Sequence, residues 1–401
     1  MIVYFNEREL AQLRNSLATC LEGYSYTWEG EDVIHLFYEP VKHAYGREGR
    51  VLFIKMEIDD EYSKKYDFIV LLDNDNIQIF SSSSNSFLDC KIRLIPSEKE
   101  MYSRSKGLLE VSILKKKRIL IIGLGSFGSQ IAIEMAKAGV GAFSLIDFDR
   151  VEPHNLARHT ATINDLGRLK TNVIKDAILG KNPYAEIEIF SIDINNNISL
   201  LESEVAKSDI VICATDNNYS RFNISKVLVG QKKIGVFGRA VTRAEGGDVF
   251  VYRPGGPCYC CLLGNSSIAN IQEEITDEES ARRNGQIPAY VSSEDADAMI
   301  QVGLSSDIAP ICNLMEKIAL MELSRGLQSG ITQLEEDLVY EYYIWANRRE
   351  KRHENWFPMP NAGSKPTIMR WYGAHICKND YCTICSEGDI VVDSENNVEG
   401  L

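Results

Sequence analysis

Three glycines form a turn that could hold a phosphate group. They stand as Gly123-x-Gly125-x-x-Gly128, after the apolar run RILII and before a segment with helical apolar spacing. Glycines in this pattern allow a tight turn and let backbone N–H groups approach a phosphate at a helix N-terminus. Asp147 follows about 20 residues later, where an acidic side chain commonly binds ribose hydroxyls. The pattern fits NAD, FAD, S-adenosylmethionine or ATP, and taken alone it favours NAD.

Charged side chains just beyond the neighbouring strands favour ATP instead. Arg158 and Lys170 suit the negative charge of a triphosphate, whereas a hydride-transfer site needs a flat slot for nicotinamide at this place. Asp216 ends the apolar run VICATD, and a carboxylate there suits Mg²⁺ bound together with phosphate oxygens. Each residue alone could be an ordinary surface charge. Together, at the strand ends of one sheet, they predict a site for ATP and Mg²⁺.

Two pairs of cysteines have the spacing of a metal site. Cys258 and Cys261 form one C-x-x-C pair, and Cys382 and Cys385 form the other. Four thiolates in two such pairs bind Zn²⁺ tetrahedrally, and a closed site of this kind is structural. The alternative is four reduced, buried cysteines, since no secretory signal suggests disulfides. We expect zinc to fasten the C-terminal tail to the sheet domain, with Cys260 left over.

Longer stretches around these residues resemble one enzyme family. The joint spacing of GLGSFGSQIAIEMAKAGVGAFSLIDFDRVEPHNLARH, GRLKT and ATDNNYSR resembles the ThiF/MoeB/ubiquitin-activating superfamily of adenylyltransferases. Upstream, Tyr102-Ser103-Arg104 resembles the Tyr-Ser/Asn-Arg motif of that family. Ser126 and Phe127 depart mildly from the family's glycine-rich loop without removing a donor. The resemblance covers about residues 100–390, and the tail, with IWANRRE and MRWYG, looks like bacterial members.

The resemblance implies an activity and a role for each matching residue. The enzyme would use ATP to activate a carboxylate as an acyl-adenylate, releasing pyrophosphate, and it would carry the same zinc site. The implied roles place Asp147 on the ribose, Asn155, Arg158 and Lys170 on the phosphates, Asp216 on Mg²⁺, Arg221 along the nucleotide site and Arg104 on the phosphates bound by the neighbouring subunit. A homodimer is therefore expected. Arg158, Lys170, Asp216 and Arg104 are the expected catalytic residues.

The acyl substrate stays open between two classes. Relatives that form a thioester carry a cysteine between the first zinc pair and the later apolar helix, but residues 262–311 contain none. Cys312 lies in the run APICNLMEKIALMEL and is expected in the core, while an ester at Ser292 or Ser293 lacks support. The tail slightly favours the C-terminus of a ubiquitin-like protein. The missing cysteine favours a ribosomally made peptide.

Two functions outside this class compete with adenylation. One is a catalytically dead adenylation fold that serves as a scaffold, which we would expect to have lost Arg158, Lys170 or Asp216. The other is an NAD-dependent oxidoreductase on a Rossmann fold, which the same charges disfavour. All three residues are present. The sequence therefore favours the adenylyltransferase.

The elements that must position these residues alternate between strand and helix. RILIIGLG, AFSLIDFD, EIEIFSI and DIVICATD are apolar enough for buried strands, and residues 130–138 and 170–182 have helical spacing. This succession predicts an α/β fold with a Rossmann-like, doubly wound, mainly parallel sheet. The strands IGVFGRA, GDVFVY, VYEYYIWAN and MRWYG, with a long helix near 308–326, would extend it.

The sequence pattern over residues 1–100 predicts a separate, small α+β domain. A helix over Asn6–Leu21, with Asn6 as its cap, precedes about five short strands, YSYTW, VIHLFY, VLFIKMEI, FIVLL and IQIF. Nothing in this domain looks catalytic, so it could recognise the substrate or a partner. Residues 101–390 would form the adenylation domain, and 391–401 a flexible tail.

Length and charge limit the other function classes. A chain of 401 residues is long enough for two domains, and a net charge of −14 argues against broad nucleic-acid binding. No apolar run approaches the ~18 residues of a membrane-spanning helix. The N-terminus lacks the pattern of a signal peptide. We therefore predict a cytoplasmic protein. The motifs described above predict that it binds ATP, Mg²⁺ and Zn²⁺.

Overall fold

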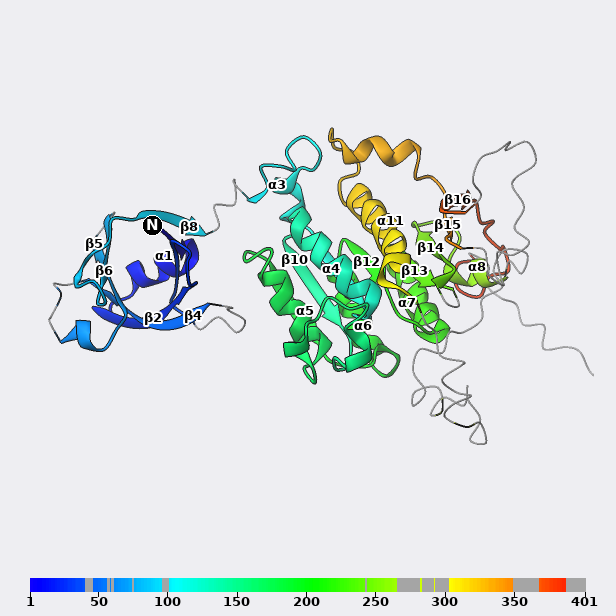
Figure 1. Cartoon of the computed structure of the whole chain (residues 1–401). Helices are drawn as coiled ribbons and strands as arrows, with labels where there is room; N and C mark the ends of the chain where they lie inside the picture. The colour runs from blue at the N-terminus through cyan, green and yellow to red at the C-terminus, as the bar shows by residue number, and fades with distance from the viewer. Residues whose placement is uncertain are drawn as a thin grey trace, which may run out of the picture. The chain divides into compact units, whose positions relative to one another are not determined.

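The chain divides into two compact units, and each is described by itself. The computed structural model describes residues 1–39, 46–55, 58, 61–73, 76–95, 101–241, 244–264, 282, 292, 303–348 and 368–386. The first unit ends at Arg104 and the second begins at Ser105 (Figure 1). Within these described ranges, every helix is too short or too polar to cross a bilayer.

The first unit is a mixed sheet that curves around one helix (Figure 1). Its eight strands lie in the order β7-β6-β5-β4-β2-β3-β1-β8. The strands are β1 (Ile2–Asn6), β2 (Cys20–Thr27), β3 (Val33–Phe37), β4 (Arg47–Ile54), β5 (Phe68–Asp73), β6 (Asn76–Ser81), β7 (Ser86–Phe87) and β8 (Lys91–Ile95). Leu10 and Leu13 of helix α1 (Glu7–Asn15) pack into the core with Val3, Phe5 and Phe53.

The N-terminal helix is shorter than the sequence pattern predicts. Asn6 caps it as expected, because its side chain accepts hydrogen bonds from the backbone N–H groups of Arg8 and Glu9. The helix ends at Asn15 rather than Leu21. Leu17 continues the apolar spacing but is fully exposed, and Leu21 belongs to β2. Three strands, β1, β7 and β8, were not predicted.

The second unit contains the predicted Rossmann-like sheet. Its eight strands lie in the order β11-β10-β9-β12-β13-β14-β15-β16. They are β9 (Arg118–Ile122), β10 (Ala142–Ile146), β11 (Glu186–Phe190), β12 (Ile210–Cys213), β13 (Ile234–Ala240), β14 (Gly246–Tyr252), β15 (Tyr342–Ala346) and β16 (Arg370–Ala374). The pairs from β11 to β13 are parallel, and those from β13 to β16 are antiparallel. Since the chain order reverses beside β9, a ligand site is expected at the carboxyl ends of β9 and β12.

Helices cover both faces of this sheet, as a doubly wound fold requires (Figure 1). The α-helices are α3 (Val111–Leu114), α4 (Ser126–Ala138), α5 (Lys170–Leu179), α6 (Ile198–Lys207), α7 (Asn218–Gln231), α8 (Tyr259–Gly264) and α11 (Ser305–Leu323). Short 3-10 turns are η1 (Tyr62–Lys64) in the first unit and η2 (Pro153–Asn155), η3 (Ile163–Asp165), η4 (Ile194–Asn196) and η6 (Ile331–Glu336) in the second. Ile119 and Ile121 of β9 face the core of α4, α5 and α11. Leu120 and Ile122 face the core of α6, α7 and α8.

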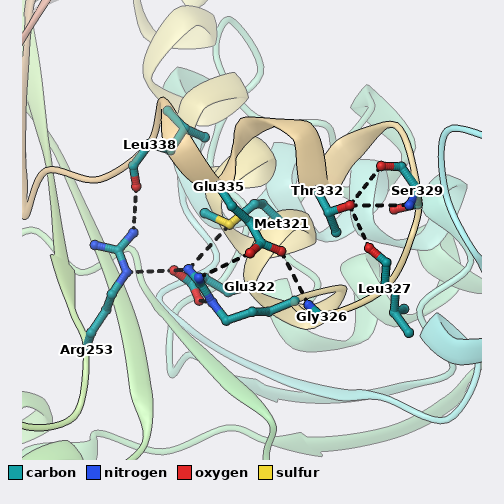
Figure 2. A network of polar contacts seen from close by, with 10 residues as sticks. Arg253, Met321, Glu322, Gly326, Leu327, Ser329, Thr332, Glu335 and Leu338 are labelled. Carbon is teal, nitrogen blue, oxygen red and sulfur yellow. Dashed lines mark hydrogen bonds and ion pairs between the residues drawn. The ribbon is translucent and has the colours of Figure 1, made fainter.

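A network of ion pairs around the buried Glu322 connects the end of α11 to the end of β14 (Figure 2). The Glu322 carboxylate accepts from Arg253 Nε at 2.7 Å and from Arg325 Nε at 2.8 Å. Arg253 also donates to the carbonyl oxygens of Leu338 and Tyr340. Burial raises the pKa of Glu322, but the hydrogen bonds from Arg325 and Arg253 outweigh it and hold the pKa below its usual range. Glu322 is therefore an anion that joins three segments.

Glu322→Gln should lower the free energy of unfolding by about 2 kcal/mol at neutral pH, because it leaves two guanidinium groups without their shared anion. The loss should stay moderate because Arg253 and Arg325 are 25% and 45% exposed. A depressed pKa stabilises the fold above the carboxyl's ordinary value of 4.5, and this contribution disappears as the pH falls through the folded value. Urea unfolding across pH should therefore show the two proteins converging as the pH falls below 4.5 and through the lowered pKa of Glu322.

Glu335→Gln is the matched control for this network. Glu335 pairs with the same Arg325 at 3.5 Å but is 28% exposed, so its loss should cost only ~0–1 kcal/mol at any pH. A Glu322→Gln protein with the same pH dependence as wild type would contradict the assigned role of the anion.

Candidate nucleotide site and cysteine cluster

The glycine turn after β9 is built so that only glycine fits at two of its positions. Gly123 has φ +85°, and a Cβ on it would lie 2.7 Å from the carbonyl oxygen of Ala214. A Cβ on Gly128 would lie 1.9 Å from the carbonyl oxygen of Gly123. Gly125 caps α4, and a Cβ there would meet no atom within 4 Å. The turn is therefore closed toward β12 and open at the start of α4, where a phosphate can approach the first amides.

Asp147 holds this turn from the end of β10. Its carboxylate accepts from the backbone N–H of Leu124 at 2.6 Å and from that of Asp149 at 2.8 Å. Burial raises the pKa of Asp147, while the positive charge of Lys170 and both backbone hydrogen bonds oppose the rise. The predicted contact with a ribose stays a prediction. The structure adds a second role, since Asp147 ties the glycine turn to the loop after β10.

His159 supports the turn from the other side and was not among the predicted site residues. Its Nδ1 accepts from the backbone N–H of Ala161 at 2.9 Å, so its Nε2 carries the proton and donates to the carbonyl oxygen of Leu124 at 2.8 Å. Burial lowers the pKa of His159 to about 4, which keeps the ring neutral. A lone histidine in the run NLARH gives no sequence signal for this contact.

The ammonium group of Lys170 interacts with three carboxylates of the site. It begins α5, is buried, and donates from Nζ to Asp149 Oδ2 at 2.8 Å. Burial lowers the pKa of Lys170, but the charges of Asp147, Asp149 and Asp216 outweigh it and raise the pKa. Lys170 is therefore a fixed cation near three strand-end carboxylates. Asp149 was not among the predicted site residues, although it stands in the same DFD stretch as Asp147.

Asn155 ends the 3-10 turn η2 after β10, and Arg158 lies in the turn that follows it. The side-chain oxygen of Asn155 accepts from the backbone N–H of Glu152 at 3.0 Å. Gln130 of α4 donates to the Arg158 carbonyl at 3.4 Å and ties this segment to the helix behind the glycine turn. Among the described residues, the guanidinium of Arg158 has no hydrogen bond or ion pair. That side chain is half-buried and is not committed to a protein partner there.

Asp216 and Arg221 belong to the loop between β12 and α7. Asp216 is exposed, at the same sheet edge as Asp147. Arg221 is only 4% exposed and donates to the carbonyl oxygen of Thr215 at 2.6 Å and to Asn218 Oδ1 at 3.3 Å. The Arg221 side chain thus holds the backbone that precedes Asp216. Its predicted contact with the nucleotide stays a prediction, and so does the predicted magnesium contact of Asp216.

Arg104 is exposed and stands at the boundary between the two units. Its predicted contact with a neighbouring subunit's site concerns a second chain and stays a prediction. Of the two candidate ester serines, Ser292 is exposed and Ser293 lies outside the described residues. Cys312 is buried in the core of α11, as predicted.

The four predicted cysteines meet at one buried point. The sulfur atoms of Cys258, Cys261, Cys382 and Cys385 all lie within 4.8 Å of one another. Neighbouring sulfurs are 3.4 to 3.9 Å apart, close to the edge of about 3.8 Å expected for tetrahedral Zn–S bonds of ~2.3 Å. These four sulfurs could therefore hold a metal ion. Cys260 and Cys377 are outside the group.

A nearby backbone group supports the cluster. The N–H of Asn379 donates to Cys261 Sγ at 3.4 Å, an arrangement that suits a thiolate ligand. Cys258 and Cys261 come from the start of α8, and the other pair comes from the segment after β16. The cluster thus joins chain segments more than one hundred residues apart.

Comparisons with known proteins match the second unit. A family model described as "ThiF family" matches residues 101–353. A probable molybdopterin-synthase adenylyltransferase of Porphyra purpurea is 32% identical over 47% of this chain and 48% of its own length. The molybdopterin-synthase adenylyltransferase of Escherichia coli is 36% identical over 37% of this chain and 59% of its own length. The chain thus spans about half the length of these curated relatives.

Solved structures show the same fold. The crystal structure of E. coli MccB with AMPCPP and MccA has a TM-score of 0.50 and 18% identity, covering 77% of each chain. The microcin C7 biosynthetic enzyme MccB in complex with N-formylated MccA also has a TM-score of 0.50 and 18% identity, over 73% of this chain and 77% of its own. At this identity the likeness supports the fold alone.

Proposed function

Since the chain belongs to the ThiF family, we propose that it is an ATP-dependent adenylyltransferase that activates a carboxylate as an acyl-adenylate. The observation that carries the proposal is the buried Lys170, whose ammonium group donates to Asp149 and interacts with the charges of Asp147 and Asp216. Acids and a buried lysine at the switch point of a Rossmann-like sheet suit Mg²⁺ and a triphosphate. Both relatives are named as adenylyltransferases, which supports the proposal as well.

The reaction transfers AMP to the substrate carboxylate. A carboxylate oxygen attacks the α-phosphorus of ATP, the bond to the β-phosphate oxygen breaks, and pyrophosphate leaves with its electron pair. No general base is needed, because the carboxylate is already ionised at neutral pH. Arg158 and Lys170 would neutralise the charge that moves onto the pyrophosphate, and Arg104 would add a cation from a neighbouring subunit. Mg²⁺, held by Asp216, would supply further charge neutralisation at the phosphates.

The four cysteines would hold Zn²⁺ in a structural role. The four cysteines are buried and would fill all four positions of a tetrahedral ion, so the ion would stabilise the fold rather than act on the acyl group. It would join α8 to the segment that follows β16. Zinc is proposed because a four-cysteine, tetrahedral set is its usual structural site.

Cys382→Ser should remove about one zinc per chain and lower the thermal unfolding midpoint, because a four-thiolate site cannot form. Metal analysis and calorimetry measure both effects. Cys377→Ser, an exposed cysteine outside the cluster, is the control and should change neither. Purified wild-type protein that carries no zinc, and that keeps its midpoint in excess chelator, would contradict the zinc site.

The acyl substrate would be the C-terminal carboxylate of a protein or peptide. Relatives named molybdopterin-synthase adenylyltransferases favour a ubiquitin-like protein, and the lack of a cysteine in residues 262–311 favours a ribosomally made peptide. Cys312 is buried, so it is a poor thioester carrier. The protein would act as a cytoplasmic homodimer, without nucleic acid or membrane partners. Its first unit would serve in substrate or partner recognition.

Two measurements test the function. Calorimetry with AMPCPP and with NAD should show binding of the ATP analogue alone. Pyrophosphate release with ATP should then require a ubiquitin-like protein or a short peptide from a neighbouring gene, and removal of its C-terminal residue should stop the release. Binding of NAD without AMPCPP would favour an oxidoreductase. Binding of AMPCPP without pyrophosphate release for any candidate would favour a scaffold.

A further inference from the structure

A chain of hydrogen bonds connects the cysteine cluster to the loop that carries Asp216. Tyr259 lies between Cys258 and Cys260, and its hydroxyl donates to Asn218 Oδ1 at 3.0 Å. The same oxygen accepts from Arg221 Nη1 at 3.3 Å. Arg221 Nη2 then donates to the carbonyl oxygen of Thr215 at 2.6 Å, directly before Asp216.

Tyr259 is held so that its hydroxyl has little freedom. The side chain is 3% exposed, and its ring stacks on Phe237 at 5.3 Å between ring centroids. Phe250 meets the ring edge-on at 6.0 Å. The backbone N–H of Tyr259 donates to Ser225 Oγ of α7 at 3.1 Å, so both the backbone and the hydroxyl of Tyr259 are bonded to that helix.

The start of α8 is thus fixed on two sides, by the cluster through Cys258 and by α7 through Tyr259. Asn218 is the first residue of α7, and its side chain is the point where the tyrosine and the arginine meet. Movement of α8 would release Asn218, and with it the orientation of Arg221 and of the Thr215 carbonyl. The position of the Asp216 carboxylate depends on that backbone.

We propose that Tyr259 is a positioning residue that makes Mg²⁺-dependent nucleotide binding depend on the integrity of the four-cysteine cluster. The proposal rests on the proposed function, because it needs a nucleotide and Mg²⁺ at Asp216. It adds a role for the cluster beyond fastening the tail. Tyr259 acts through Asn218 and Arg221 rather than on the nucleotide itself, so its effect is indirect.

Tyr259→Phe tests the proposal by removing one oxygen and keeping the ring. Calorimetry with AMPCPP in Mg²⁺ should show affinity weakened about threefold to tenfold, as expected for one lost hydrogen bond. Without added Mg²⁺ the two proteins should bind AMPCPP equally, and both should carry the same zinc content. A merely structural loss would weaken binding under both conditions.

Tyr252→Phe is the matched control. Tyr252 is also a buried tyrosine beside Cys258, but its hydroxyl faces the Gly255 backbone rather than Asn218. Its loss should leave AMPCPP affinity unchanged with and without Mg²⁺.

Asn218→Ala provides a second test that leaves the cysteines untouched, so it remains decisive if Tyr259→Phe loses zinc. It should reproduce the Mg²⁺-dependent loss, and adding Tyr259→Phe to it should cost nothing more. Additive effects, or wild-type affinity in Asn218→Ala or in zinc-loaded Tyr259→Phe, would overturn the inference alone. Wild-type protein that binds no AMPCPP would overturn the proposed function and the inference with it.

Discussion

Asp216→Asn should reduce ATP–pyrophosphate exchange by about a hundredfold to a thousandfold while the protein stays folded. The carboxylate at the end of β12 is the proposed Mg²⁺ ligand, and an amide keeps its size but removes its charge. Losing metal-based charge stabilisation at the phosphates costs several kcal/mol in the transition state, and each ~1.4 kcal/mol is a factor of ten. Exchange assays with the cognate acyl substrate measure the loss directly.

Asp209→Asn is the matched control for this variant. Asp209 directly precedes β12, at the amino ends of the parallel strands. There it pairs with Lys117 at 3.2 Å and accepts from the Arg118 backbone N–H. The same change of charge there should alter stability slightly and leave exchange intact. Full exchange activity in a folded Asp216→Asn protein would exclude Asp216 as a required metal ligand.

The parts of the site that the sequence predicted are those where one residue type is required. Gly123 and Gly128 lie where a Cβ would strike backbone, so the glycine pattern has a direct steric cause. Cys258 and Cys382 gather with their partners because two C-x-x-C pairs make a tetrahedral set. The buried strands of the sheet could also be predicted, because successive residues such as Ile119 and Leu120 are apolar and face opposite sides of the sheet.

The parts that were not predicted depend on tertiary contacts. Helix α7 carries polar residues along much of its length, and its apolar residues show almost no helical periodicity. His159 and Tyr259 gain their roles from a carbonyl and an amide that the chain brings in from elsewhere. The N-terminal helix was overextended because Leu17 continued its spacing, although that side chain points into water.

Mixing two inactive variants should restore activity if Arg104 acts on a neighbouring subunit. Lys170→Ala should be nearly inactive because it removes the buried cation of the site, and Arg104→Ala should be nearly inactive because it removes a cation supplied in trans. A heterodimer of the two would carry one intact site. Random exchange makes half of the dimers mixed, so the mixture should reach about a quarter of wild-type activity.

Each result of the mixing experiment assigns Arg104 differently. Subunit exchange can be monitored by measuring the mass of dimers of differently tagged chains. Recovery of activity that appears only after exchange supports the role in trans. Exchange without recovery would place Arg104 in its own subunit's site. Arg104→Ala with normal activity would remove it from the mechanism and leave it a surface residue whose ion pairs contribute ~0–1 kcal/mol. Lys106→Ala, a change of the same charge two residues away, is the control and should leave exchange activity unchanged.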